Sequence, residues 1–134
     1  MGRRFLRQAE SDLQVAHRKM LPGSHYVAAS LAHQAADKAL KAAYWHVRGE
    51  EAPWSHDLNA AAERVAERVG VLPGPVDAAL QRLDPLFEWI RYPSGNLDEP
   101  IPVDLINETV AWRSLTDAEE VLAWIRILFQ QSWP

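Results

Sequence analysis

The sequence predicts an all-α protein, an up-and-down bundle of four to five antiparallel helices with an irregular excursion before the last helix. Three observations predict this class. Apolar residues recur at spacings of three and four over most of the 134 residues, which is the period of a helix with one buried face. Short segments rich in Gly and Pro separate these stretches. No pair of segments has the pattern of paired strands.

The first two helices are predicted from their apolar positions and from the turn between them. The stripe of the first helix, within residues 3–20, consists of Phe5, Ala9, Leu13, Ala16 and Met20. The turn "LPGS" breaks this helix, and its Ser24 is expected to cap the next one. The second helix is expected over residues 25–48, ending at Gly49 because glycine readily adopts the left-handed conformation that follows a helix.

The third and fourth helices are expected on either side of the segment "GVLPGP". Ser55 is the expected N-cap of the third helix, with Asp57 in its first turn, where the helix dipole favours an acid. Pro75 suits the first turn of the fourth helix. Pro85 lies inside the apolar pattern of that helix, so we expect a kink or a break near Asp84.

Residues 92–115 lack a sustained period and contain three prolines, so we expect a long irregular loop there, with a helical turn near Asn107. The segment "TDAE" that follows has the pattern of a capping box, with Thr116 as the cap and Glu119 reaching back to it. The last helix is therefore expected to begin at Thr116.

Length, composition and charge limit the possible classes. A chain of 134 residues suits a single domain, residues 1–134. It contains no Cys, so it has neither a disulfide framework nor a thiolate metal site. The formal net charge of −4 argues against broad nucleic-acid binding. No apolar run approaches the roughly 20 residues that cross a bilayer, and the N-terminus lacks a signal peptide's apolar region. We expect a cytoplasmic protein without a membrane partner.

The second predicted helix has two distinct sides. Its apolar side consists of Ala28, Leu31, Ala32, Ala35, Ala36, Ala39, Leu40, Ala43 and Val47. The opposite arc, roughly 100° wide, holds Ser30, Gln34, Asp37, Lys38, Lys41, Trp45 and Arg48. One interpretation of this arc is a solvated face with an Asp37–Lys41 ion pair one turn apart. Trp45 among the lysines favours instead a stacking surface or a protein interface.

Four segments occur in an order and at intervals typical of one family. They are "AESDLQVA" (9–16), "HQAADKALKA" (33–42), "SHDL" (55–58) and "RYP" (91–93). With these segments the sequence resembles the HEPN domain family (higher eukaryotes and prokaryotes nucleotide-binding domain) over almost its whole length. The central run of that family typically reads Gln-Gln-Ala-Ala-Glu-Lys-Ala-Leu-Lys-Ala. Here His33 replaces the first Gln and Asp37 replaces the Glu.

The resemblance implies a helical bundle that forms homodimers and partners a minimal nucleotidyltransferase, in a toxin–antitoxin or nucleotide-handling system. The family's name records a proposed nucleotide-binding role, so the implied ligand is a nucleotide such as ATP, with no resident cofactor. Carried over residue by residue, this role would rest on Gln34, Lys38, Lys41, His56 and Arg91. Two ammonium groups one turn apart, joined by a guanidinium and an imidazole, can hold phosphate oxygens.

The wider superfamily to which this resemblance points contains many metal-independent ribonucleases. Their signature, at the start of a late helix, is an Arg followed by four to six residues and then a His. No His follows Arg91 or Arg113 here. The expected function is therefore a non-catalytic binding subunit, with no catalytic residues. One alternative is a ribonuclease toxin that acts on RNA with a non-standard pair, His56 and Arg91. Another is a simple dimerisation module whose polar arc only faces solvent.

The same polar residues also have purely structural interpretations. His33 and Asp37 could begin a metal site, but no further ligands complete it, so no metal is expected and His33 is assigned a hydrogen bond at the helix surface. His56, in the first turn of the third helix, could bond a neighbouring backbone group, and Arg91 could pair with Asp57 or Asp12. Two tryptophans beside apolar stripes, Trp89 and Trp124, are expected in the core or at a dimer interface.

Overall fold

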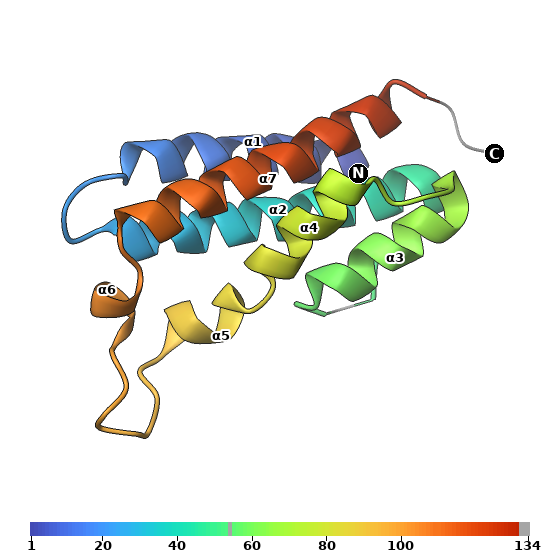
Figure 1. Cartoon of the computed structure of the whole chain (residues 1–134). Coiled ribbons are helices and arrows are strands. Elements are labelled where there is room, and N and C mark those ends of the chain that lie inside the picture. Colours follow the sequence, from blue (N-terminus) through green and yellow to red (C-terminus); the bar gives the residue numbers. More distant parts are fainter. Residues whose placement is uncertain (54, 132–134) are drawn as a thin grey trace.

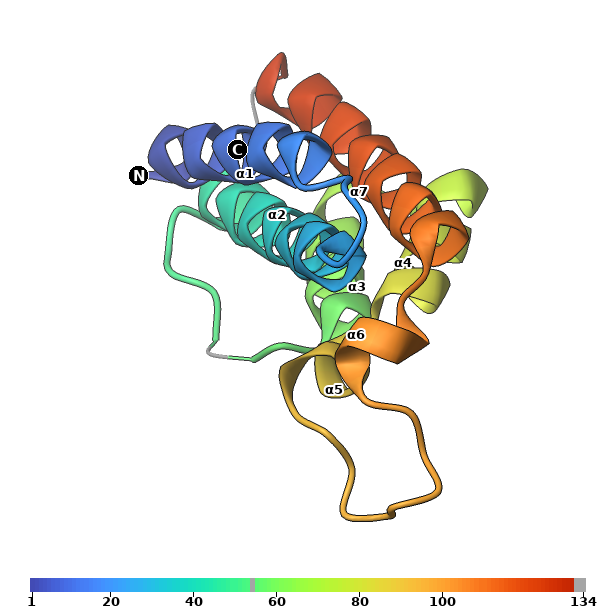
Figure 2. The same cartoon turned by 90° about the vertical axis from the view of Figure 1, so that its left-hand side faces the viewer.

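Helix α2 (His25–Arg48) is the central element of an all-α fold (Figure 1). The computed structural model describes residues 1–53 and 55–131, and of Arg91 it describes the backbone alone. Helices α1 (Gly2–Arg18) and α7 (Glu108–Phe129) pack along α2, as Figures 1 and 2 show from two directions. No strand occurs in the described ranges, which confirms the predicted all-α class.

The other helices extend this three-helix body. They are α3 (Leu58–Val69), α4 (Gly74–Leu83), α5 (Leu86–Arg91) and α6 (Pro102–Leu105). Helix α3 packs on α2, α4 packs on α7, and the short α5 contacts both α2 and α6. Because α5 comes back to α2, residues far apart in the sequence meet along one side of the central helix.

The alanine-rich side of α2 is the spine of the core. Ala28, Ala32, Ala36, Ala39 and Ala43 have no exposed surface, as the sequence pattern predicted. Small side chains allow neighbouring helices to approach closely. At Gly2 on α1, an added Cβ would lie 2.9 Å from the carbonyl oxygen of Ala42. The backbones of α1 and α2 therefore approach each other closely at this point. Larger side chains from the neighbours fill the remaining space, and burying one Leu or Ile contributes about 1.5–3 kcal/mol.

Two predicted boundaries are confirmed. Helix α2 ends at Gly49, which has a φ of 71° in the left-handed region. The break near Asp84 is also present, since α4 ends at Leu83 and α5 begins at Leu86. The Asp84 carboxylate at this break accepts a hydrogen bond of 2.9 Å from the backbone N–H of Leu58, so it helps to cap α3 from another part of the chain.

Of the two predicted caps, one has the predicted position and the other is wrong. Ser24 is the N-cap residue of α2, as predicted, but its hydroxyl donates back to the carbonyl oxygen of Lys19, at 2.8 Å, instead of accepting from the helix. Asp57, not Ser55, is the N-cap of α3, and its carboxylate accepts from the N–H of Ala60 at 3.0 Å. The Ser55 hydroxyl oxygen accepts instead from the backbone N–H of Asp57 at 3.1 Å, before the helix begins. The histidine at position 56 consequently precedes α3.

The predicted irregular segment 92–115 is too long, because α7 already begins at Glu108. Its N-cap is Asn107, whose side chain accepts from the N–H of Val110 at 2.9 Å. Thr116 lies inside the helix, where its hydroxyl donates to the carbonyl oxygen of Trp112 at 3.0 Å. The expected capping box at 116–119 is therefore wrong. The helical turn expected near Asn107 is present just before it, as α6.

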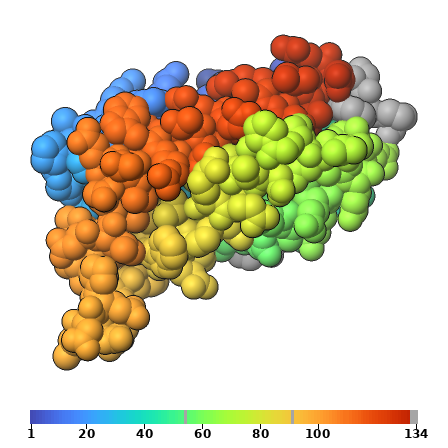
Figure 3. All heavy atoms as spheres, in the orientation of Figure 1, coloured from blue at the N-terminus to red at the C-terminus, as the bar shows by residue number. Residues whose placement is uncertain are grey.

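The part of the segment that stays irregular projects from the body. Every residue from 92 to 101 is exposed, and we call this segment the arm. Figure 3 shows it extending beyond the packed helices. Large apolar side chains lie exposed on the arm and beside it, namely Trp89, Tyr92, Leu97, Ile101 and Val103. None of the described helices is both long enough and apolar enough to span a bilayer.

Candidate functional site

A pocket of about 450 Å³ lies on the polar side of α2, between α1, the segment before α3, and α5. Its lining residues are Phe5, Ser30, His33, Gln34, Asp37, Lys38, Lys41, His56, Phe87 and Ile90. Four of the five predicted site residues are among them, Gln34, Lys38, Lys41 and His56. The side chain of the fifth, Arg91, lies outside the described part of the chain, although its backbone follows Ile90 at the end of α5.

An ion pair joins α1 to α2 at this pocket. The Lys38 ammonium donates to Asp12 at 2.6 Å between Nζ and Oδ2. The other oxygen of Asp12 accepts from the Gln8 side-chain amide at 2.9 Å. Only 10% of the Asp12 side chain is exposed, so its charge is held by specific partners and not by bulk water. Asp12, suggested from the sequence as a partner for Arg91, pairs with Lys38.

The second ion pair lies within α2. Lys41 Nζ is 3.0 Å from Asp37 Oδ2, across the expected single turn of helix. The exposed fractions of these side chains are 15% for Lys41 and 13% for Asp37. This part of the arc is therefore the wall of a pocket, and the solvated-face interpretation is wrong for these two residues.

His56 enters the pocket from the segment before α3. Its Nδ1 lies 3.7 Å from Asp37 Oδ2, so one carboxylate faces both the Lys41 ammonium and the imidazole. The imidazole stacks on the Phe87 ring of α5, with 4.5 Å between centroids and 21° between planes. The structure therefore gives His56 a carboxylate contact and a ring contact.

His33 is not at the helix surface as predicted. It is buried, with 4% exposure, and its ring lies 5.7 Å from the centroid of Phe87. Within the described ranges, no group of three or more His, Cys, Asp or Glu residues could hold a metal ion. A ligand in this pocket would therefore meet ammonium, carboxylate and amide groups beside an aromatic wall.

The tryptophan predictions had mixed outcomes. Trp124 is buried, as expected for a core residue. Trp89 is 51% exposed beside the arm, so it is not a core residue, and its place at a dimer interface stays a prediction. Trp45 is half-buried, and its indole N–H is enclosed without a hydrogen-bond partner in the described part of the protein. Trp54, which follows Trp45 in the next loop and would extend a stacking surface, lies outside the described residues.

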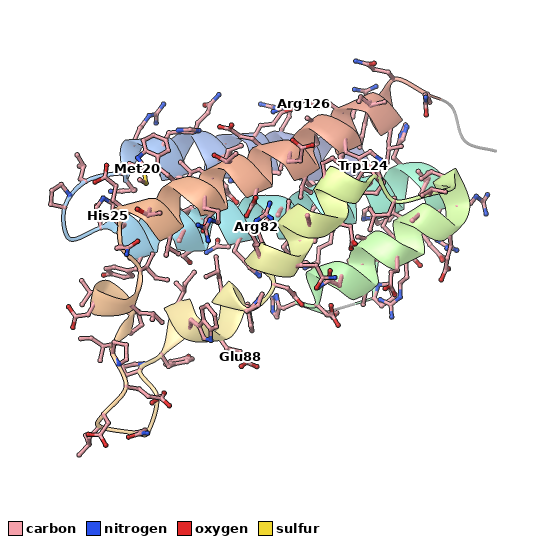
Figure 4. The ribbon with its side chains drawn as sticks, in the orientation of Figure 1. Met20, His25, Arg82, Glu88, Trp124 and Arg126 are labelled. Atoms are coloured by element: carbon pink, nitrogen blue, oxygen red, sulfur yellow. The ribbon has the colours of Figure 1, made fainter. Side chains whose placement is uncertain are left out.

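Outside the pocket, one strong contact was not anticipated from the sequence. Arg82 of α4, labelled in Figure 4, lies beside α7. It bonds the Asp117 carboxylate of α7 through Nε and Nη2, with a shortest distance of 2.8 Å. This hydrogen bond, and secondly the charge of Asp117, raises the pKa of Arg82 above its usual value. The contact joins two helices far from the pocket, so we assign it to the fold. The aromatic wall that Phe5 and Phe87 form in the pocket lining was not predicted from the sequence either. Both residues lie in apolar stripes, where a phenylalanine is ordinarily expected to pack in the core.

The fold and the pocket together define a small helical-bundle domain in which a central alanine-rich helix carries a Lys-x-x-Lys pair into a pocket. The chain belongs to the HEPN domain family, whose family model matches residues 3–128.

Solved structures are consistent with this assignment. The crystal structure of TT1696 from Thermus thermophilus superimposes with a TM-score of 0.82 and 26% identity, covering 95% of this chain and 97% of that one. The structure of ST0689, an archaeal HEPN homologue, has a TM-score of 0.74 and 23% identity, covering 94% and 95%, and supports the fold alone. A search of curated protein sequences found no match.

Proposed function

We propose that this HEPN protein is a non-catalytic binding subunit that holds a nucleotide in the α2 pocket and works with a minimal nucleotidyltransferase. One observation carries the binding part of the proposal. Gln34, Lys38, Lys41 and His56 come from two separate segments and line one pocket of about 450 Å³. A pocket of this size with a few convergent polar groups on an apolar wall is typical of small-molecule sites.

A thermal-shift series tests nucleotide binding. A ligand that binds only the folded state must raise the melting temperature, by an amount that grows with its concentration. We expect such a shift with at least one nucleotide, and its loss in the Gln34→Ala/His56→Ala variant, because both side chains line the pocket. Lys19→Ala is the matched control, since Lys19 is exposed and follows α1 at the opposite end from Phe5. The absence of a shift with every common nucleotide would overturn the proposal.

The partner part rests on the family and on the arm. A group of exposed apolar side chains often marks a protein interface. Trp89, Tyr92 and Leu97 are 51%, 76% and 101% exposed, and they lie within residues 89–97, on α5 and the arm. This surface suits the contact with a second copy or with the nucleotidyltransferase, in the toxin–antitoxin or nucleotide-handling arrangement that the family suggests.

Co-expression tests the partner directly. The protein and a nucleotidyltransferase encoded beside it should co-elute in gel filtration at micromolar concentration, and the protein alone should elute as a homodimer. Tyr92→Ser with Leu97→Ser should weaken one of these associations. Val71→Ser is the matched control, because Val71 is 90% exposed but lies between α3 and α4. Separate elution of the two wild-type proteins would count against the partnership.

The ribonuclease alternative keeps one supporting observation. The Asp37 carboxylate lies 3.7 Å from His56 Nδ1, and a carboxylate in this position can orient an imidazole for proton transfer. An enzyme of this kind, with Arg91 as the charged partner, would cleave RNA and lose that activity in His56→Ala. Cleavage that persists in His56→Ala, or that never occurs, removes this alternative. A dimerisation module would show neither nucleotide binding nor cleavage.

A further inference from the structure

We infer that the α2 pocket recognises the base of its nucleotide and not a polyphosphate chain, so that a nucleoside or a monophosphate binds as tightly as the triphosphate. This inference rests on the proposed function, because it names the ligand chemistry of the same pocket. Two independent features support it, the pairing of the pocket's charges and the aromatic wall.

The charges of the two lysines are already compensated. Lys38 is 2.6 Å from Asp12, and Lys41 is 3.0 Å from Asp37. The formal charges of these four side chains sum to zero. A site built for several phosphates normally presents cations in excess, since each terminal phosphate carries about 1.5 to 2 negative charges near neutral pH. Here the phosphates would approach two carboxylates together with the two ammonium groups.

The lysines are also held in place. Asp37 and Lys41 are both mostly buried, so water and salt screen their charges only weakly. Breaking this ion pair therefore costs more free energy than breaking a pair at an open surface. Asp37 in addition faces His56 at 3.7 Å. To bind a polyphosphate, both ammonium groups would have to leave their carboxylates, and each carboxylate would remain nearby as a repelling charge.

The rest of the pocket suits a flat heteroaromatic ring. His56 and Phe87 form a stacked pair, and His33 lies beside the same phenylalanine at 5.7 Å. Phe5 and Ile90 complete the apolar part of the lining. Bases bind such surfaces by stacking, with little dependence on their identity. The polar groups match the edge of a base, because Gln34 can both donate and accept while the carboxylates can accept from an amino group.

The test is a calorimetric titration of the full chain with adenosine, guanosine, cytidine and uridine, and with the 5′-mono- and triphosphate of each. For the base that binds best, we expect the three dissociation constants to agree within threefold and to change little between low and moderate salt. A tightening of tenfold or more from nucleoside to triphosphate, with steep salt dependence, overturns the inference but leaves the proposed function standing. No binding by any member of the series overturns both.

Charge variants supply a second, opposite test. Asp12→Asn with Asp37→Asn removes the two carboxylates and leaves both lysines, so triphosphate affinity should rise at least tenfold while nucleoside affinity changes less than threefold. Asp77→Asn is the matched control, because Asp77 is an exposed carboxylate on α4 outside the pocket. If the double variant folds and its affinity for the triphosphate does not rise, the inference is overturned. If the double variant does not fold, Asp37→Asn alone must give the same direction of change.

The aromatic wall can be tested separately. Phe87→Leu keeps an apolar side chain but removes the ring, and we expect all three forms of the ligand to lose at least fivefold in affinity together. A loss confined to the triphosphate, or no loss in any form, overturns the role of stacking.

Discussion

Lys38 on α2 and Asp12 on α1 form an ion pair with 2.6 Å between Nζ and Oδ2, and this contact joins the first two helices at the edge of the α2 pocket. The Asp12 side chain is 10% exposed and that of Lys38 is 33% exposed. The pair therefore contributes both to the packing of α1 on α2 and to the charge of the pocket. Its removal has consequences for stability that do not depend on any ligand.

Asp12→Ala should lower the free energy of unfolding by about 1–3 kcal/mol, because it removes a mostly buried carboxylate that accepts from both Lys38 and Gln8. Urea denaturation followed by circular dichroism measures this change. The control Asp77→Asn, on an exposed carboxylate, should change it by less than about 0.5 kcal/mol. A change for Asp12→Ala as small as that of the control would contradict a stabilising role for the pair.

The two competing starts of α7 predict opposite effects on stability. Asn107→Ala should destabilise the protein by about 1 kcal/mol, because Asn107 caps the helix. Thr116→Ala should be neutral or slightly stabilising, because an exposed threonine inside a helix has a lower helix propensity than alanine. Thermal unfolding of the two variants compares them directly. The reverse order would mean that the helix begins at Thr116.

The alanine spine of α2 should not tolerate larger side chains. Ala39→Leu inserts a leucine where no surface is exposed, and the resulting overpacking should destabilise by about 1–3 kcal/mol or more. Ala78→Leu introduces the same side chain at an exposed position of α4 and should be nearly neutral. Chemical denaturation distinguishes them. Equal stability of the two variants would show that α2 does not require small residues.

The Arg82–Asp117 contact predicts a particular pH dependence. Asp117 raises the pKa of Arg82 above its unfolded value, so the stability from this shift is fully present below the unfolded pKa. It is lost only as the pH rises through the folded pKa, which lies above the ordinary working range. The difference in melting temperature between wild type and Arg82→Gln should therefore stay constant from about pH 7 to about pH 10. A difference that shrinks within this range would contradict the assignment.

Periodicity predicted the locally determined features of the fold well. The bounds of α2, its buried alanines and the break before Leu86 follow from local rules, namely helical spacing, a left-handed glycine and a proline without an N–H. The start of α7 could not be predicted in this way. Residues 108–115 bury Ala111 and Leu115 against the body, and this tertiary packing outweighs a capping pattern that is only local.

The candidate site was predicted in part, because sequence spacing reports which residues share a helix face but not what faces them. The arc containing Lys38 and Lys41 was identified from α2 alone. The partner of Lys38 is on α1, and the ring that stacks on His56 is on α5, so both contacts depend on how helices pack. Asp12 carried a usable signal, an acid beside an apolar stripe. Phe87 carried none, since a phenylalanine in such a stripe ordinarily packs in the core.

Nucleotide binding in the α2 pocket is tested most directly by an NMR titration of the labelled chain with the best-binding nucleoside monophosphate. We expect signals from Gln34, Lys41 and His56 to shift together, along one saturation curve, because one ligand contacts α2 and the segment before α3 at once. Signals from Arg82 and Asp117, outside the pocket, should not move. No shift at saturating ligand, or shifts confined to residues outside the pocket, would contradict the claim that this pocket is a nucleotide site.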